Sequence, residues 1–385
     1  MTDVLSRREL MRRAVAGSTL LTVPGILAAC GGSSSESSGS DGDKTLAKTL
    51  RFSNWTLYID VDEKTKKHPT LDMFQKKTGT TVSYIEDIND NASYFGKIQG
   101  PLSRGQSIDR DIIVLTDNTR YPSLLIKKGW VEKLDKSALP NIENLQDALA
   151  HPNWDENRDY SLPWQSGMTG IAYNDKLTDP VLSMDDLLEN PKLKGKITLL
   201  NEMADAMSLV MLANGDDPAK VTDATFDKAL KRIQKAVDSG QVRQFTGNDY
   251  SGPLSKGDLS ACMAWSGDVV QLQADNKHLH WNLAKDGGDI WTDNMLIPKG
   301  GNAFTASTYM NFVYDPKIQA LIEDYVNYIC PVKGAKEELL KIDPDVAKNT
   351  LIFPTDEMLD NVHIFDAAAL SNQKYLEAWQ NLISA

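Results

Sequence analysis

The stretch 111–115 reads Asp-Ile-Ile-Val-Leu, and it decides the fold class of this 385-residue chain. A short, continuous apolar run is typical of a parallel strand that is buried on both faces of a sheet. Outward from it, the pattern predicts strands over 49–52 and 80–85 and helices over 71–77 and 122–128. This alternation of strands and helices predicts an α/β lobe with ligand loops at the carboxyl ends of the strands.

The same alternation restarts after Pro163. The elements expected in this second part are strands over 171–174, 196–200 and 259–265, helices over 204–213 and 225–237, a return crossing at 295–298 and a last helix over 373–383. The chain has no internal repeat and no heptads, which excludes solenoids and coiled coils. About 340 residues follow the N-terminal tract. A single compact hydrophobic core usually holds fewer residues than this, so two lobes are expected.

Residues 1–29 are expected to be an export signal. Four arginines between Arg7 and Arg13 precede an apolar run that is too short to span a bilayer, which is typical of a removable signal. The adjacent arginines after Ser6 resemble a twin-arginine signal, although the sequence does not decide between the two export routes. The run ends in Leu-Ala-Ala-Cys30, which resembles a bacterial lipobox with Cys30 as the lipidated first residue. An ordinary signal with an incidental cysteine is the alternative.

Residues 30–46 are expected to be the lipidated cysteine and a flexible tether. The tract 31–44 contains glycine, serine, acids and one lysine but no large apolar side chain, so it cannot bury enough surface to fold. No later segment is apolar for long enough to span a membrane. We therefore expect an exported protein, in the periplasm or at the outer face of the cytoplasmic membrane, that touches the membrane only through its lipid.

The charge of the chain favours cationic partners. The formal net charge is -12; residues 1–29 hold four arginines and two acids, a net of +2, so the remainder is near -14. An acidic surface argues against nucleic acid as a partner. Cys262 and Cys330 could pair in an exported protein, but two buried thiols are the expectation, and neither lies in a metal-type spacing.

Tryptophans stand two or three residues from carboxylates at two distant places. The stretch 264–268 reads Ala-Trp-Ser-Gly-Asp, and 290–294 reads Ile-Trp-Thr-Asp-Asn. A third stretch, 54–58, reads Asn-Trp-Thr-Leu-Tyr after the first expected strand. Aromatic faces beside anions favour an organic ammonium in a dry pocket, because the ring quadrupole and the carboxylate both attract positive charge. This pattern indicates capture of a cation rather than catalysis.

Two further acids have an ordinary structural alternative. Glu202 and Asp205 lie at the start of the helix expected over 204–213, where acids often cap the helix and favour its dipole. For Asp205, we give helix capping at least as much weight as contact with a ligand. Asp293, by contrast, follows Trp291 and precedes the expected crossing at 295–298, where a carboxylate has no routine structural use.

Seven motifs carry a family resemblance. In chain order they are Asn54-Trp-Thr-x-Tyr58, Asp111-Ile-Ile-Val, Asp159-Tyr-Ser-Leu-Pro163, Glu202-x-x-Asp205, Met263-Ala-Trp-Ser-Gly-Asp268, Gly287-Gly-x-x-Trp-x-Asp293 and Tyr328-x-x-Pro331. From about Leu50 to the C-terminus, this order resembles the spermidine/putrescine-binding proteins, the extracytoplasmic receptors of polyamine ABC importers.

The resemblance implies a two-lobed periplasmic-binding-protein fold of the type II kind, with a ligand cleft between the lobes. Lobe 1 would comprise 47–162 and 294–340, and lobe 2 would comprise 163–293 and 341–385. The protein would be a monomer that captures putrescine or spermidine and delivers it to a membrane permease, with the ATPase on a separate chain. We expect no enzymatic activity, no catalytic residues, no cofactor and no metal.

The resemblance also implies a set of ligand-binding residues. These are Trp55, Thr56, Tyr58, Thr116, Glu202, Asp205, Trp265, Asp268, Trp291, Asp293 and Tyr328. Leu57 stands where spermidine-binding members have a glutamate, whereas Asp268 follows the putrescine-binding pattern. A tyrosine of the family near Thr116 falls here at Asn118 or Tyr121. These departures leave the choice of amine open.

Two alternatives remain at this level. One is a receptor for another cationic or a sugar-like solute, since sugars also stack on indoles. The other is an exported hydrolase: the chain has no Gly-x-Ser-x-Gly elbow and no Walker A loop, but a glycosidase needs only two carboxylates.

Overall fold

The structure is a computed structural model, and it describes residues 44–62 and 64–384. The expected export signal, Cys30 and the tether up to residue 43 lie outside the described residues.

The described residues form one ten-stranded sheet with the order β2-β1-β3-β9-β4-β7-β5-β6, in which β10 also pairs with β9 and β8 with β4. The strands are β1 (Thr49–Trp55), β2 (Thr81–Ile88), β3 (Ile112–Thr116), β4 (Ser161–Asn174), β5 (Ile197–Leu200), β6 (Val242–Thr246), β7 (Ala261–Trp265), β8 (Leu279–Asn282), β9 (Gly288–Leu296) and β10 (Val362–His363). β1 pairs in parallel with β2 and β3, and β5 pairs in parallel with β6 and β7.

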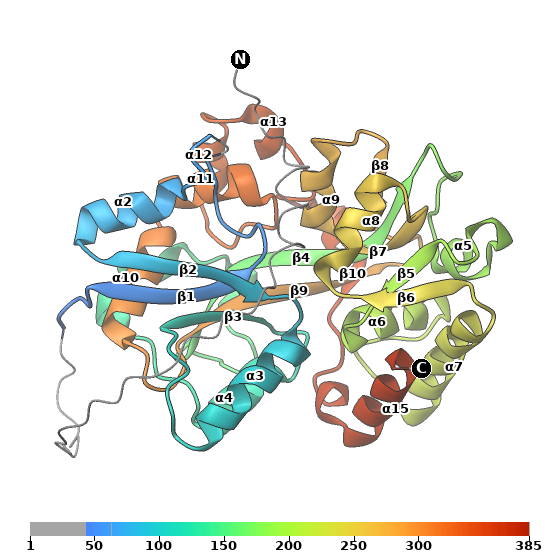
Figure 1. Cartoon of the computed structure of the whole chain (residues 1–385), viewed down its shortest axis with the longest axis horizontal. Coiled ribbons are helices and arrows are strands. Elements are labelled where there is room, and N and C mark those ends of the chain that lie inside the picture. The colour runs from blue at the N-terminus through green and yellow to red at the C-terminus, as the bar shows by residue number, and fades with distance from the viewer. Residues whose placement is uncertain (1–43, 63, 385) are drawn as a thin grey trace, which may run out of the picture. The chain divides into compact units, whose positions relative to one another are not determined.

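Helices follow most of the parallel strands and cover the sheet (Figure 1). They are α2 (Pro69–Thr78), α3 (Asn91–Ser103), α4 (Tyr121–Lys127), α5 (Met184–Glu189), α6 (Met203–Ala213), α7 (Asp223–Asp238), α8 (Ser251–Lys256), α9 (Ser266–Gln273), α10 (Ala303–Val313), α11 (Pro316–Val326), α12 (Ala335–Leu339), α13 (Pro344–Ala347), α14 (Asp356–Leu359) and α15 (Gln373–Ile383). Short 3₁₀ turns lie at 136–138, 140–144, 147–149, 191–193, 248–250 and 369–371. No helix in the described part of the chain has the length and apolarity to cross a membrane.

The predicted α/β class is confirmed, and β3 shows why. Ile112 to Leu115 are fully buried, as the apolar run predicts for a strand covered on both faces. α2 ends at Gly79 in the left-handed conformation (φ 80°), where glycine has no steric cost. Cys262 and Cys330 are buried free thiols, in line with the expectation.

Two long strands join the two halves of the sheet. In Figure 1, β1, β2 and β3 with α2, α3 and α4 occupy one half, β5, β6 and β7 with α5, α6 and α7 the other, and β4 and β9 run through both. β9 is antiparallel to β3 over 293–296 and to β4 over 289–296, while β4 pairs with β7 over 169–173. The strand predicted over 171–174 is therefore the end of a fourteen-residue strand, all of it buried.

The prediction missed the first part of β4 because Pro163, Gly167 and Gly170 interrupt its apolar pattern. The two glycines make room for rings. A Cβ on Gly167 would lie 2.5 Å from the ring of Trp291, and a Cβ on Gly170 would lie 2.6 Å from that of Trp281. A larger side chain would displace the Trp291 ring at Gly167, and at Gly170 it would displace both the Trp281 ring and the backbone oxygen of Asn282, 2.5 Å away.

Candidate ligand-binding site

One cavity, with about 400 Å³ of space that includes solvent at its open side, brings together the eleven residues predicted to bind ligand. Its lining residues are Trp55, Thr56, Tyr58, Asn91, Thr116, Asn118, Glu202, Asp205, Asn248, Trp265, Asp268, Trp291, Asp293 and Tyr328. Both halves of the sheet contribute. Trp55 and Thr116 end β1 and β3, while Trp265 ends β7. The side chains thus gather at the carboxyl ends of parallel strands, where α/β folds place their ligands.

Aromatic rings form a continuous chain along this cavity. Trp55 lies edge-on to Trp265 (ring centroids 6.1 Å apart), and Trp265 lies edge-on to Trp291 (6.1 Å). Trp291 is tilted against Tyr328 (5.8 Å), which meets Tyr58 edge-on (5.1 Å). Such pairs present both faces and edges, and the faces attract cations and cover methylene groups.

Asp293 lies in the middle of β9, not before a strand as the sequence suggested, and it is only 3 % exposed. The Tyr58 hydroxyl donates to its Oδ2 (2.8 Å), and the Thr116 hydroxyl donates to its Oδ1 (2.7 Å). Burial raises the pKa of Asp293 to about 7, and these two hydrogen bonds oppose the rise. A carboxylate offers about four lone-pair sites, so two remain for a ligand.

Asp268, in the first turn of α9, accepts three short side-chain hydrogen bonds. The Asn248 amide and the Tyr250 hydroxyl donate to its Oδ2 (2.7 Å each), and the Tyr328 hydroxyl donates to its Oδ1 (2.7 Å). Burial raises its pKa to about 6 against these bonds. Its orientation is therefore fixed before any ligand arrives.

Asp205 shares its surroundings with a second buried acid, Asp289. The Asn118 amide donates to both carboxyls, to Asp205 Oδ2 at 3.4 Å and to Asp289 Oδ2 at 3.0 Å. Thr169 donates its hydroxyl to Asp205 and receives the Trp291 indole N–H at 3.0 Å. Burial raises the pKa of both acids, and for Asp289 the charge of Asp205 adds to that rise.

Glu202 is the N-cap residue of α6, but its side chain makes no capping hydrogen bond. Its Oε1 accepts instead from the backbone N–H and the side-chain amide of Asn91, at 3.1 and 3.0 Å. The Asn91 amide also bonds Thr116, so α3 links the two halves of the site. Burial raises the pKa of Glu202 to about 7. The structure thus favours a role at the cavity over the helix-capping alternative.

The charge of the cavity is one-sided. Four of its lining residues are acids, and none of the described lining residues is a lysine or arginine. Ionised carboxylates in a buried place need a partner of opposite charge, because desolvation costs several kcal/mol per ion. The pKa values of these acids are raised because no positive charge lies beside them, and a ligand cation would supply that charge.

Three lining residues and one neighbouring buried acid, Asp289, escaped the predicted set. Asn91, Asn118 and Asn248 line the cavity as amides in loops or at a helix start, and such residues carry no periodic signal. Asn118 was considered only as a position where the family has a tyrosine. Asp289 did leave a signal: residues i, i+2 and i+4 of a strand share a face, so Asp289 accompanies Trp291 and Asp293 on β9.

Comparison with known proteins places the chain in a family. Residues 70–355 match the model of the family described as bacterial extracellular solute-binding protein. The chain belongs to the bacterial extracellular solute-binding proteins. This solute-binding protein is 26 % identical over 337 residues to the spermidine/putrescine-binding periplasmic protein of Escherichia coli strain K12, covering 87 % of this chain and 91 % of that one. It is 28 % identical over 364 residues to the putrescine-binding periplasmic protein SpuD of Pseudomonas aeruginosa, covering 88 % and 92 %.

A solved structure agrees on the fold. The substrate-binding protein PotD of a spermidine/putrescine ABC transporter from Streptococcus pneumoniae superposes on this solute-binding protein with a TM-score of 0.70. The match covers 88 % of this chain and 98 % of that one at 21 % sequence identity. The predicted two-lobed periplasmic-binding-protein architecture is confirmed, and the cavity lined by the aromatic rings and acids is the candidate solute site.

Proposed function

We propose that this protein captures a linear polyamine, putrescine or spermidine, between its lobes and delivers it to the permease of an ABC importer. The observation that carries the proposal is the cavity itself, where buried carboxylates face a chain of aromatic rings without a lysine or arginine among the described lining residues. The names of the relatives in Escherichia coli and Pseudomonas aeruginosa support polyamines as the solute class.

The cavity suits a chain of methylenes with charged ends. Burial of each methylene against the indoles would contribute about 0.8 kcal/mol, and each ammonium over a ring about 0.5–2 kcal/mol. Asp268 and Asp293 would accept hydrogen bonds from the ammonium groups, offsetting the cost of removing the charge from water. The separation of the acids would then select the spacing between the ammonium groups that they hold.

The remaining parts of the proposal concern the lobes and the membrane. Residues 47–162 with 294–340 and residues 163–293 with 341–385 would move as two lobes about β4 and β9, closing over the amine. The protein would act as a monomer that releases its ligand chemically unchanged, and a separate chain would supply the ATPase. Cys30 would carry the lipid that holds the exported protein at the outer face of the membrane.

Isothermal titration calorimetry tests the ligand class. Putrescine, spermidine and a neutral sugar are titrated separately into the purified protein. We expect heat of binding with at least one amine and none with the sugar. Binding of the sugar alone would exclude the polyamine proposal in favour of a sugar receptor, and turnover of any of them would point to an enzyme.

Fractionation of the producing cells tests the anchor. The unmodified protein is expected in the membrane fraction, whereas the Cys30→Ser variant is expected in the soluble exported fraction. Mass spectrometry of the mature N-terminus checks for the lipid directly. An unlipidated N-terminus upstream of residue 30 would contradict the lipobox interpretation.

A further inference from the structure

A second hollow adjoins the cavity, and the two share residues. This outer groove encloses about 1360 Å³ and is open to solvent. Asn118 and Glu202 line both the cavity and the groove, so the two spaces meet at these side chains. We call this meeting point the neck.

The groove runs between elements from both halves of the sheet. One wall is formed by the start of α3, with Asp90 and Ser93, and by the loop into α4, with Arg120. The other wall is formed by the start of α6 and by α15, which face α3 and α4 in Figure 1. The Trp379 indole donates to the carbonyl of Asn201 (2.9 Å), which fixes α15 against the end of β5. The second wall is therefore held in place.

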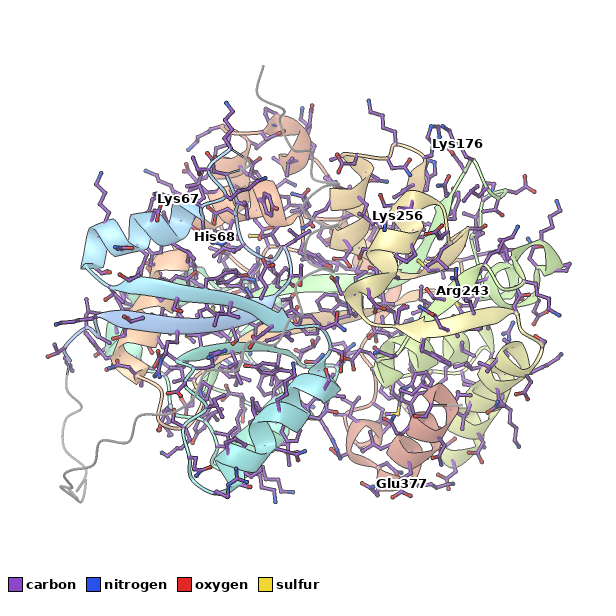
Figure 2. All side chains as sticks on the ribbon, in the orientation of Figure 1. Lys67, His68, Lys176, Arg243, Lys256 and Glu377 are labelled. Carbon is purple, nitrogen blue, oxygen red and sulfur yellow. The ribbon has the colours of Figure 1, made fainter. Side chains whose placement is uncertain are left out.

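The groove, like the cavity, has acids beside apolar side chains, but it is open to solvent and includes one base. Its charged residues are the acids Asp90, Glu202 and Glu377 and one base, Arg120, whose guanidinium lies over the Tyr121 ring at 5.7 Å. Glu377 lies at the outer edge of α15 in Figure 2. Between these charges the wall is apolar, with Met203, Leu376 and Ile383. Methylenes against apolar side chains and amines near carboxylates suit a surface of this kind.

We infer that a linear amine anchored at Asp268 and Asp293 passes the neck beside Glu202 and extends its other end into the groove. This inference rests on the proposed function and deepens it. Beyond putrescine and spermidine, the solute class then extends to diamines with a substituent on one nitrogen. The substituted end is recognised through apolar contact with α15.

Calorimetry with a matched pair of amines tests the inference on the full chain. The pair is 1,4-diaminobutane and its N-benzyl derivative, in which one nitrogen carries an aromatic ring. We expect both to bind, with dissociation constants within about tenfold of each other, because the ring has a place in the groove. A loss of more than about a hundredfold for the benzyl derivative alone would overturn the inference while leaving the proposed function intact. If neither amine binds, the inference is overturned. Spermidine, titrated in the same way, then decides the proposed function, which fails if spermidine does not bind either.

Variants on α15 locate the substituent. Leu376→Trp fills the groove, and it is expected to weaken the benzyl derivative by about tenfold or more while changing diaminobutane less than about threefold. Gln380→Trp serves the same purpose at an exposed groove position, which guards against misfolding of the first variant. Asn381→Trp is the control, since Asn381 is exposed on the same helix and does not line the groove. Equal effects of the groove and control variants would overturn the inference.

Discussion

At the scale of single residues, the sequence predicted the cavity almost completely. Most of the aromatic and acidic positions lie in short motifs that follow a strand or start a helix, whereas Trp291 and Asp293 lie within β9. What it did not predict is how the acids are held. The bonds from Tyr250 and Asn248 to Asp268 join positions about twenty apart in the chain, and no local pattern reports them.

Asp293→Asn is the sharpest test of the anion that we place at the centre. The variant keeps the volume of the side chain and one acceptor for Tyr58 or Thr116, but it removes the charge that an ammonium would meet. Amine binding should weaken by about 2–5 kcal/mol, the range for breaking a buried charge pair. Calorimetry with putrescine measures the change, and circular dichroism confirms the fold.

Asp289→Asn is the matched control for that variant. Asp289 lies on the same strand face but does not line the cavity, and its pKa is raised well above the ordinary range by burial and by Asp205. Its replacement therefore removes no carboxylate that an ammonium in the cavity would meet. We expect affinity within about 1 kcal/mol of the parent protein. If both variants lost the same affinity for the amine, Asp293 would not be the carboxylate that binds the ammonium.

At the scale of elements, helices and strands with strong periodicity were predicted and those with interruptions were not. α3 was missed because Gly96, Gly100 and Pro101 break its pattern, yet Asp90 caps it by accepting the Ser93 N–H. β4 was found only in its last four residues, because a proline and two glycines interrupt the rest of the strand. In both cases a tertiary contact, not local propensity, decides the element.

Gly267, in the first turn of α9, illustrates such a contact and can be tested. A Cβ there would lie 2.2–2.5 Å from three atoms of the Tyr328 ring. Gly267→Ala must displace that ring, which bonds Asp268 and touches Trp291. We expect a loss of stability of about 1–3 kcal/mol, the usual cost of overpacking, and weaker amine binding. Urea unfolding and calorimetry measure the two effects.

Gly96→Ala provides the comparison. Gly96 is exposed in the interior of α3, and beyond its chain neighbours and its own helix backbone no atom would come within 4 Å of an added Cβ. Alanine there should leave stability unchanged or raise it by up to about 1 kcal/mol, because it restricts the unfolded chain and favours the helix. A Gly267→Ala variant that behaves like this control would show that the Tyr328 ring tolerates displacement.

At the scale of the whole molecule, the sequence predicted two halves but not how they share a sheet. The alternation of strands and helices was predicted for both halves. Of β9, only the last residues were predicted, as part of a crossing at 295–298. Its polar residues Asp289, Thr292 and Asp293 interrupt the apolar pattern, and Asp293 lines the cavity. The polar residues of β9 therefore prevented its prediction as a strand from the sequence.

The buried acids make stability depend on pH with a definite sign. The pKa values of Asp293 and Glu202 rise to about 7 in the folded protein, above their ordinary values of 3.8 and 4.5. Between about pH 4 and 7 the folded state holds protons that the unfolded chain has released, so stability falls as pH rises. Asp293→Asn removes one such group. The free energy of unfolding of this variant, relative to that of the parent protein, should therefore increase from pH 5 to pH 8. One titrating carboxyl allows a change of about 1–3 kcal/mol. Urea titrations at both pH values measure this, and a constant difference would contradict it.

Ligand binding must couple to the same protons. An ammonium favours the ionised carboxylates, so it lowers the pKa values that burial raises, and at pH values below about 7 binding has to release protons. Polyamine affinity should therefore increase from pH 5 to pH 8, by about tenfold per pH unit for each proton released. Calorimetry in buffers with different ionisation enthalpies counts the protons, and Asp293→Asn should release fewer than the parent protein at pH 6. A cation held mainly by aromatic faces would bind equally at both pH values and release none, so this measurement separates the work of the acids from that of the rings.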